Sequence, residues 1–258
     1  MKKYLKANYH THTVYCKHAW GTMREYIEAA IENGIQILGF SDHVPFPEDG
    51  EYVSDIRMSM EEAASYVEDI RALQDEYKDR IKIYIGFEAE YVKDYFASQK
   101  EMLKRLKVDY MIMGQHFFGK EYEKNYTGTP TEEEERLKQY VDCVLEGMRT
   151  GAFAYLAHPD MIHYKGDDSI YKREITRLCC ALKEMDIPLE LNVLGILKKK
   201  HYPSERFFEI VGNVGNDVIL GLDVHWVEQI GDASSYEKAM QIVEKYDLNV
   251  IETLKGLA

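Results

Sequence analysis

One unit recurs along the chain: a short apolar segment, a loop and then an amphipathic helical pattern. The apolar segments are rich in Ile, Val, Leu, Tyr and Met, which is typical of buried strands. They lie at residues 4–10, 36–42, 81–88, 109–116, 153–158, 188–193 and 217–224. Strands separated by helices pair in parallel, and strands that are apolar on both faces belong to a sheet covered on both sides. The pattern therefore predicts an α/β fold, a closed or nearly closed barrel, with an open doubly wound sheet as the alternative.

Local signals mark where the intervening helices begin and end. Capping boxes, in which a Ser or Thr side chain and a Glu three residues later satisfy free backbone N–H groups, begin at Thr22, Ser59 and Thr131. Asn33-Gly34 is typical of a helix C-terminus. Further helical patterns cover 95–107, 169–185, 204–211 and 235–246. Because no linker or internal repeat interrupts the series, we expect residues 1–258 to form one domain.

The charge balance excludes several classes of partner. The chain has 258 residues and a formal net charge of −13, which argues against nucleic acid and against anionic membranes as partners. No apolar run approaches the ~20 residues of a membrane span, and the first residues lack the apolar region of a signal peptide. The four cysteines show no CxxC pairing, which favours a reducing cytoplasm. We expect a monomer or a homodimer.

Histidines gather where the predicted strands end. Seven of the nine lie at or just beyond a strand's carboxyl end, namely His10, His12, His18, His43, His116, His158 and His225. In a parallel barrel those ends converge on one face, where active sites are built. Residues two apart in an extended segment point the same way, so His10 and His12 can hold one ion together. Absence of a Gly-rich GxGxxG or GxxxxGK[ST] motif after the first strand leaves little support for a nucleotide-binding Rossmann or P-loop site.

Two carboxylates share this pattern, Glu88 at the third strand end and Asp223 at the seventh. Imidazole nitrogen and carboxylate oxygen suit Zn, Fe or Mn, and nine candidate ligands are enough for two or three ions. Ions about 3.5–4 Å apart clamp phosphoryl oxygens and activate water. A single strand-end His is usually a satisfied polar residue, and a strand-end Asp or Glu can simply cap a helix. Seven imidazoles on one face without metal would be costly, which favours the metal site.

The same motifs resemble the PHP (polymerase and histidinol phosphatase) family, and within it the monofunctional histidinol-phosphate phosphatases. The matching segments occur in order over essentially the whole chain, at 10–12, 15–22, 39–45, 57–59, 86–90, 157–160, 190–192, 202–204 and 221–225. The resemblance implies a distorted (β/α)7 TIM-like barrel and three divalent metal ions, with Zn the first candidate and Fe or Mn the alternatives. Leu222 and Val224 depart from the residues more usual beside Asp223, and Gln115 from the small residue more usual before His116.

The resemblance also distributes the ligands. It implies that His10, His12, Glu88 and Asp223 hold one ion, that His18, His43 and His225 hold a second, and that His116 and His158 hold a third with Glu88 bridging. The activity implied is hydrolysis of a phosphate monoester, L-histidinol phosphate of histidine biosynthesis, by a water molecule that the ions activate. The alternatives are a phosphoesterase for another small phosphorylated metabolite or nucleotide, and a non-catalytic metal-binding scaffold.

Residues outside the ligand set have weaker signals. Asp42, beside His43, is the candidate to orient an imidazole or move a proton, with a structural role as the alternative. Arg57, from the resemblance, and Asn192, at the sixth strand end, are candidate substrate contacts. Lys198-Lys199-Lys200 is expected to be a solvated loop. We expect that Cys16 is not a ligand, and that His163 and His201 lie outside the site.

Overall fold

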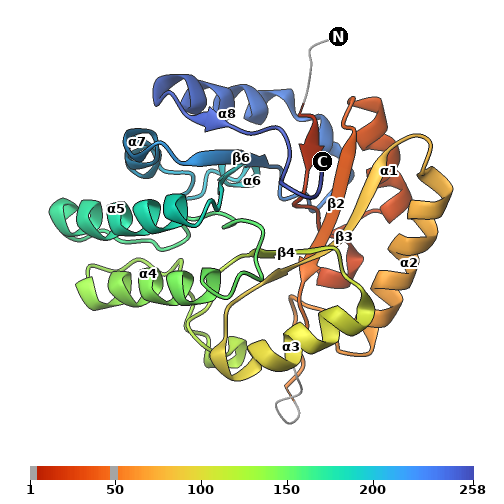
Figure 1. Cartoon of the computed structure of the whole chain (residues 1–258), viewed down its shortest axis with the longest axis horizontal. Helices are drawn as coiled ribbons and strands as arrows, with labels where there is room; N and C mark the ends of the chain where they lie inside the picture. Colours follow the sequence, from red (N-terminus) through yellow and green to blue (C-terminus); the bar gives the residue numbers. More distant parts are fainter. Residues whose placement is uncertain (1–4, 47–51) are drawn as a thin grey trace.

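A curled sheet of parallel strands forms the centre of the protein, with helices around it (Figure 1). The computed structural model describes residues 5–46 and 52–258, so Tyr4 of the first predicted strand lies outside the described residues. One ladder pairs, in sequence order, β1 (Ala7–Asn8), β2 (Ile37–His43), β3 (Lys82–Ala89) and β4 (Tyr110–Met113). The other pairs β5 (Leu189–Asn192), β6 (Asp217–Gly221) and β7 (Asn249–Val250).

Single backbone bridges join the two ladders. Leu156 bridges both Met113 at the end of β4 and Leu189 at the start of β5, and Thr11 bridges Val224 beyond β6. The α/β class and the curled parallel sheet are thus confirmed, and the strands lack the order reversal of a doubly wound sheet. A complete seven-repeat barrel stays a prediction.

One strand prediction was wrong, and one strand was missed. Residues 153–158 form no regular strand: Leu156 makes single bridges to Met113 and Leu189, and the backbone turns at His158, whose φ is +30°, a value outside the extended region. The last strand, β7, was not predicted at all; it is two residues long and lacks the apolar run used to find the others.

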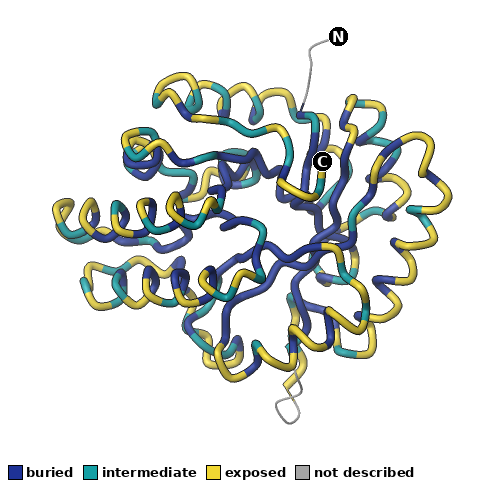
Figure 2. The backbone as a smooth tube through the Cα atoms, in the orientation of Figure 1, coloured by how far each residue is buried: buried dark blue, intermediate teal, exposed yellow. Residues whose placement is uncertain are grey.

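The longer helices cover the outside of the sheet with a buried inner face and an exposed outer one (Figure 2), whereas the short α6 has no exposed residue. They are α1 (Met23–Glu32), α2 (Glu62–Tyr77), α3 (Lys93–Leu106), α4 (Glu134–Met148), α5 (Asp168–Glu184), α6 (Val193–Leu197), α7 (Glu205–Val214) and α8 (Ala233–Lys245). Short 3-10 turns lie at η1 (Val14–Cys16), η2 (Glu121–Glu123) and η3 (Val227–Gly231). The four predicted helical ranges agree with α3, α5, α7 and α8 to within a few residues.

The capping predictions are confirmed at two of three places. Thr22 forms its reciprocal bonds with Glu25, and Ser59 does so with Glu62. The reciprocal bonds between Thr131 and Glu134 do not form, and the Thr131 hydroxyl accepts a bond from Glu133 N instead. The backbone of Thr131 also pairs with the chain at His163 and Lys165, which holds Thr131 away from a capping position.

Tyr110 fills the interior of the sheet below the strand ends. Its ring lies against Gly39 of β2 and Gly86 of β3, where an added Cβ would lie 2.2 and 2.3 Å from Tyr110 atoms. Its hydroxyl donates to the backbone carbonyl of Tyr9 at 2.7 Å. Because side chains on a strand alternate, the face that carries Gly39 and Gly86 also carries His43 and Glu88 farther along. The packed interior therefore ends in a floor of polar side chains.

Candidate metal centre

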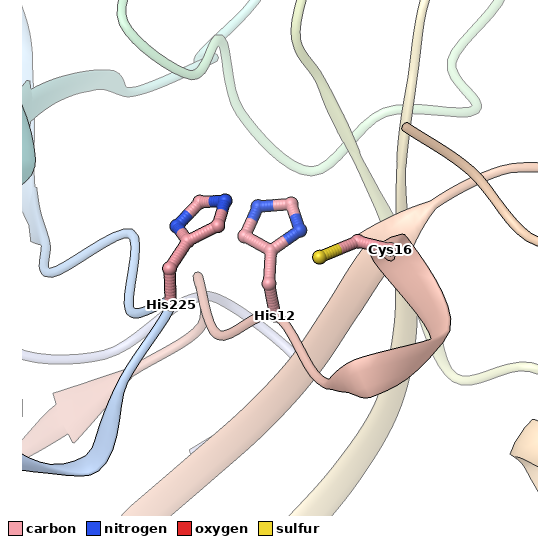
Figure 3. A group of neighbouring side chains, drawn as sticks. All are labelled: His12, Cys16 and His225. Atoms are coloured by element: carbon pink, nitrogen blue, oxygen red, sulfur yellow. The ribbon is translucent and has the colours of Figure 1, made fainter. Parts of the chain in front are cut away.

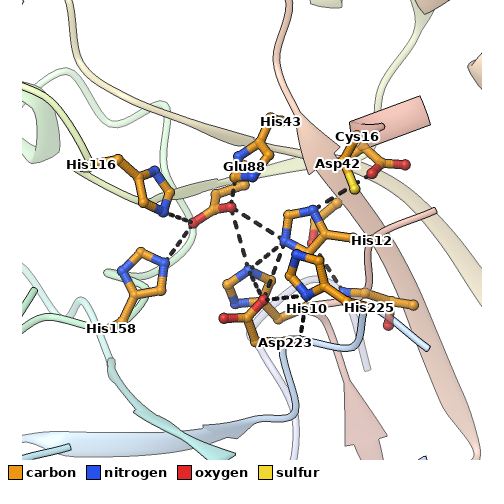
Figure 4. A network of polar contacts seen from close by, with 12 residues as sticks. His10, His12, Cys16, Asp42, His43, Glu88, His116, His158, Asp223 and His225 are labelled. Atoms are coloured by element: carbon orange, nitrogen blue, oxygen red, sulfur yellow. Dashed lines mark hydrogen bonds and ion pairs between the residues drawn. The ribbon is translucent and has the colours of Figure 1, made fainter. Parts of the chain in front are cut away.

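All nine predicted ligands converge above this interior, at the carboxyl ends of the strands (Figure 4 shows eight of them). Seven are buried, whereas His18 and His116 are partly exposed. Their elements follow the prediction: His43 ends β2, Glu88 lies in β3, and the others stand in the loops that follow β1, β4, Leu156 and β6. The convergence is an observation, and binding of metal by these residues stays a prediction.

Four of these side chains place one donor atom each around a common point. The Nε2 atoms of His10 and His12 are 3.2 Å apart. Glu88 Oε2 is 3.6 Å from His10 Nε2 and 3.4 Å from His12 Nε2. Asp223 Oδ1 is 3.5 and 3.3 Å from the same two nitrogens. Two atoms that both bind a tetrahedral ion at ~2.0–2.1 Å lie about 3.3 Å apart. Five of the six edges of this tetrahedron thus have the length that a zinc-like ion requires.

The Glu88 carboxylate reaches two groups of imidazoles at once. Its Oε2 atom faces His10 and His12 and is 3.1 Å from His43 Nδ1. Its Oε1 atom is 2.7 Å from His158 Nε2 and 3.5 Å from His116 Nε2. Gly114 makes room for it, since a Cβ there would lie 1.9 Å from Oε1. Glu88 is therefore placed to bridge two ions.

His18 and His225 form a further pair, with their Nε2 atoms 3.0 Å apart. The Nδ1 atom of each faces a backbone carbonyl, that of Cys16 and that of Asp223. A carbonyl only accepts, so each Nδ1 carries the proton and each neutral ring turns an Nε2 lone pair toward the other. Burial, the largest cause for both, lowers the pKa of His18 and lowers that of His225 to about 3. Two uncharged lone pairs in contact repel, and a cation bound by both removes that repulsion.

Two carboxylates behind the cluster of nine predicted ligands orient the rings of His10 and His116. His10 Nδ1 is 2.7 Å from Glu190 Oε1, and His116 Nδ1 is 3.1 Å from Glu90 Oε1. Carboxylates in this position fix the tautomer and the orientation of a metal-binding imidazole. Other buried atoms form no hydrogen bond within the described chain, among them His158 Nδ1 and also Glu88 Oε2 and His43 Nδ1, which lie 3.1 Å apart without forming one. Glu88 Oε2 and His43 Nδ1 point into the cluster, as expected of atoms that bind ions.

Backbone strain is also concentrated here. His158 and Asp223 have φ values of +30° and +52°, in the region that non-glycine residues rarely occupy. Such strain persists only where the surroundings impose it, and it clusters at functional sites. Both residues are predicted ligands.

The electrostatics of the cluster favour cations. Burial by itself would raise the pKa of the Asp223 and Glu88 carboxyls, but the surrounding imidazoles hold both pKa values well below the usual range. Burial would lower the pKa of His10 and His12, but the carboxylates raise both well above the ordinary value. Positive charge is thus favoured between these four groups, and the donor set fits divalent ions that would supply it.

Cys16 lies at the edge of the cluster (Figure 3). Its Sγ atom and ring nitrogens of His12 and His225 lie within 4.8 Å of one another. Burial raises the pKa of the thiol, which disfavours the thiolate that binds metals. Our expectation that Cys16 is not a ligand stays a prediction.

The three residues predicted for catalysis or substrate binding all lie behind the cluster. Asp42 is buried, accepts a 2.9 Å bond from Thr13 N, and is 3.6 Å from Nδ1 of His12, so it lies beside His12 and not between His43 and the pocket. Asn192 donates to Asp223 at 3.0 Å and to Glu190 at 2.9 Å. It therefore orients a predicted ligand.

Arg57 is only 2% exposed, and its guanidinium forms four hydrogen bonds within the described residues. It donates to Glu121, to both oxygens of Glu90 and to the carbonyl of Val44. Neither it nor Asp42 nor Asn192 lines the pocket described below. Arg57 therefore faces Glu90 and Glu121, and Glu90 joins it to His116. A contact between Arg57 and substrate stays a prediction.

Sequence reasoning did not assign Glu90 and Glu190. Both stood inside quoted motifs, and each lies two residues from an assigned residue, Glu88 or Asn192. That spacing puts each acid on the same strand face as its neighbour and could have indicated a role behind the ligands.

A pocket of about 560 Å³ opens over the cluster. Eight of the nine predicted ligands line it, and His10 lies beneath. Its walls include Trp20, Tyr126, Tyr202 and Trp226, with Lys198 and Lys200. A small molecule entering this pocket reaches the Glu88 carboxylate directly. Within residues 5–46 and 52–258, no helix has the length and apolar character needed to cross a membrane.

Comparison of the chain with models of known protein families identifies the class to which this fold and site belong. Residues 8–193 match the family model of the PHP domain, which is more than half of the chain. The chain belongs to the PHP domain family, as the motifs predicted.

Individual relatives narrow the resemblance. The chain is 29% identical over 237 residues to a probable histidinol-phosphatase of Deinococcus radiodurans, covering 86% of this chain and 87% of that protein. It is 24% identical over 264 residues to the histidinol-phosphatase of Lactococcus lactis, covering 98% and 95%. The crystal structure of histidinol phosphate phosphatase from Lactococcus lactis, complexed with zinc, L-histidinol and phosphate, superposes with a TM-score of 0.72 at 21% identity, covering 96% and 98%. At that identity the superposition shows a shared fold.

Proposed function

We propose that this protein is a metal-dependent phosphate monoester hydrolase with three divalent ions, of which Zn is the first candidate and Fe or Mn the alternatives. The observation that carries the proposal is the tetrahedron of donor atoms from His10, His12, Glu88 and Asp223. The Glu88 carboxylate joins it to the imidazoles of His116 and His158. His18, His43 and His225 would hold the remaining ion. We further propose that residues 1–258 form one PHP domain, a distorted (β/α)7 barrel.

In the proposed reaction the oxygen of a water molecule bonds to phosphorus, the bond from phosphorus to the ester oxygen breaks, and a proton passes to the leaving oxygen. The bound ions would offset the negative charge of the phosphoryl group and make the water more acidic. The chain's own groups keep the ligands oriented: Glu190 holds His10, and Asn192 holds Asp223. Asp42 is a positioning residue, because its carboxylate stands behind Nδ1 of His12.

Two substrate candidates have different support. The names of the relatives favour L-histidinol phosphate, and with it a place in histidine biosynthesis. Lys198 and Lys200 line the exposed outer part of the pocket, its mouth, and they favour another small phosphorylated metabolite or nucleotide. Two cations there would repel a substrate that carries an ammonium group.

The experiment is metal removal and reconstitution. Protein depleted with a chelator should release no phosphate from p-nitrophenyl phosphate or L-histidinol phosphate, and Zn²⁺, Fe²⁺ or Mn²⁺ should restore release. Elemental analysis should find three ions per chain. Glu88→Gln should lose both activity and ions, whereas Glu209→Gln, an exposed change on α7, should lose neither. Full activity after exhaustive metal removal would overturn the proposal.

A further inference from the structure

The mouth of the pocket is lined by aromatic rings and lysines, whereas its floor is lined by the imidazoles and carboxylates of the predicted ligands. Aromatic rings form its walls, including Phe117, Tyr126, Tyr202 and Trp226. Trp20 also lines it and is 68% exposed, the second most exposed large apolar side chain of the described residues. Flat rings on several sides favour a flat, planar leaving group, since stacked and edge-on aromatic contacts stabilise such a group.

The charges at the mouth are positive. Lys198 and Lys200 line the pocket, while the carboxylates among the described lining residues are Glu88 and Asp223. Both of those acids are buried on the floor and committed to the cluster. The chain as a whole has a net charge of −13, so a pocket mouth that carries two lysines is opposite in sign to the protein's net charge.

Neither lysine forms an ion pair with a described residue. The Nζ atom of Lys198 lies 4.1 Å from the centre of the Trp226 ring, a cation–π contact that keeps it beside the mouth. The backbone fixes the turn itself, because Lys198 N donates to Leu194 and Lys200 N donates to Gly195. This turn follows α6, which begins directly after β5 at Val193, so the loop that carries the lysines is anchored to the strand that supplies Asn192.

We infer that the leaving group preferred by this pocket is a flat ring that carries an anionic substituent, a carboxylate or a second phosphate, which Lys198 and Lys200 attract. The inference rests on the proposed hydrolase activity and specifies its substrate class. The transferred phosphoryl group goes to the metal cluster, and the substituent at the far end of the ring meets the lysines. L-Histidinol phosphate presents an ammonium group there, so its turnover falls below that of an anionic ring.

The test compares aryl phosphates that differ in the charge of one substituent. Protein reconstituted with Zn²⁺ is assayed with phenyl phosphate, 4-carboxyphenyl phosphate, 1,4-phenylene bisphosphate, 4-(aminomethyl)phenyl phosphate and L-histidinol phosphate. The wild type is compared with Lys198→Met, Lys200→Met and the double variant, and Lys199→Met is the matched control because it belongs to the same exposed turn but does not line the pocket. Intrinsic reactivities of the esters cancel in the ratio between wild type and variant.

We expect each single variant to lower the preference for the anionic over the aminomethyl ester about threefold to fivefold, and the double variant about tenfold, through KM rather than kcat. Lys199→Met should leave the preference unchanged. The carboxylate and bisphosphate arms show which anion is favoured. An unchanged preference in the double variant, or a wild-type preference for the aminomethyl ester or L-histidinol phosphate, overturns the inference. Absence of phosphate release from every ester, phenyl phosphate included, instead overturns the proposed hydrolase activity.

Discussion

The floor and the mouth of the pocket stand on the same strand ends but hold their charges differently. On the floor, the two carboxylates and most of the imidazoles are buried, and Glu190 and Asn192 orient His10 and Asp223 from behind. At the mouth, Lys198 and Lys200 are exposed and without ion-pair partners among the described residues. Buried charges act strongly at short range, whereas exposed ones act weakly and are screened. The floor is therefore suited to chemistry and the mouth to selection.

The largest effect should come from removing one charge from the floor. Asp223→Asn keeps the shape of the side chain but removes a charged donor that is 3.3 Å from His12 Nε2. We expect kcat/KM to fall by about a thousandfold or more, together with loss of at least one ion by elemental analysis. Full metal content with full activity would show that the floor does not depend on this carboxylate.

The next effect concerns stability rather than chemistry. Burial alone would raise the pKa of Glu90, but Arg57 and His116 bring it down to about 2. Arg57→Met leaves Glu90 and Glu121 buried without their cation, so the free energy of unfolding should fall by about 3–5 kcal/mol.

Chemical denaturation measures that loss, with Arg149→Met, an exposed arginine, as the control. If Arg57→Met instead leaves stability intact and raises KM alone, Arg57 is a substrate contact, as its motif suggested.

A smaller effect should follow from loosening a ligand from behind. Glu190 is 2.7 Å from His10 Nδ1 and accepts a 2.8 Å bond from His158 N. Glu190→Gln should lower metal affinity about 10- to 100-fold, measured by competition with a chelator. Excess metal should restore its activity, whereas it should not restore that of Asp223→Asn.

The comparison of floor and mouth also shows which parts of the site could be predicted from the sequence. The floor was predictable because its residues obey local rules: ligand types stand at strand ends, often two apart, as in His10 and His12. The parallel arrangement of the strands then brings those ends together without knowledge of any side-chain contact. Glu88 was found for the same reason.

The mouth was not predictable because identical residues have different surroundings. Lys198, Lys199 and Lys200 are indistinguishable in the sequence, yet only the first and third line the pocket. Which lysine faces inward depends on the turn after α6. The surroundings of Arg57 were not predictable for a related reason: its partners, Glu90 and Glu121, are 33 and 64 residues away, so their contact is set by tertiary packing.

A pH experiment tests whether protons compete with metal ions for the imidazoles on the floor of the pocket. The carboxylates raise the pKa of His10 and His12 well above the ordinary value in the metal-free protein, despite the opposing effect of burial. An ion must displace those protons, so metal affinity falls as the pH falls. Activity should therefore decline toward acid pH, and tenfold more Zn²⁺ should move that decline to lower pH. An acid limit that does not respond to metal concentration would assign the decline to another group.

Salt should have the smallest effect, and it should act on the mouth alone. Raising the ionic strength from about 0.05 to about 0.5 M shortens the screening length to a few ångströms. The preference for an anionic over an aminomethyl aryl phosphate should shrink about threefold, because Lys198 and Lys200 are exposed. The metal content should stay constant, because seven of the nine predicted ligands are buried. A preference that resists salt while ions are lost would reverse the roles assigned to the two regions, since selection would then depend on the buried charges.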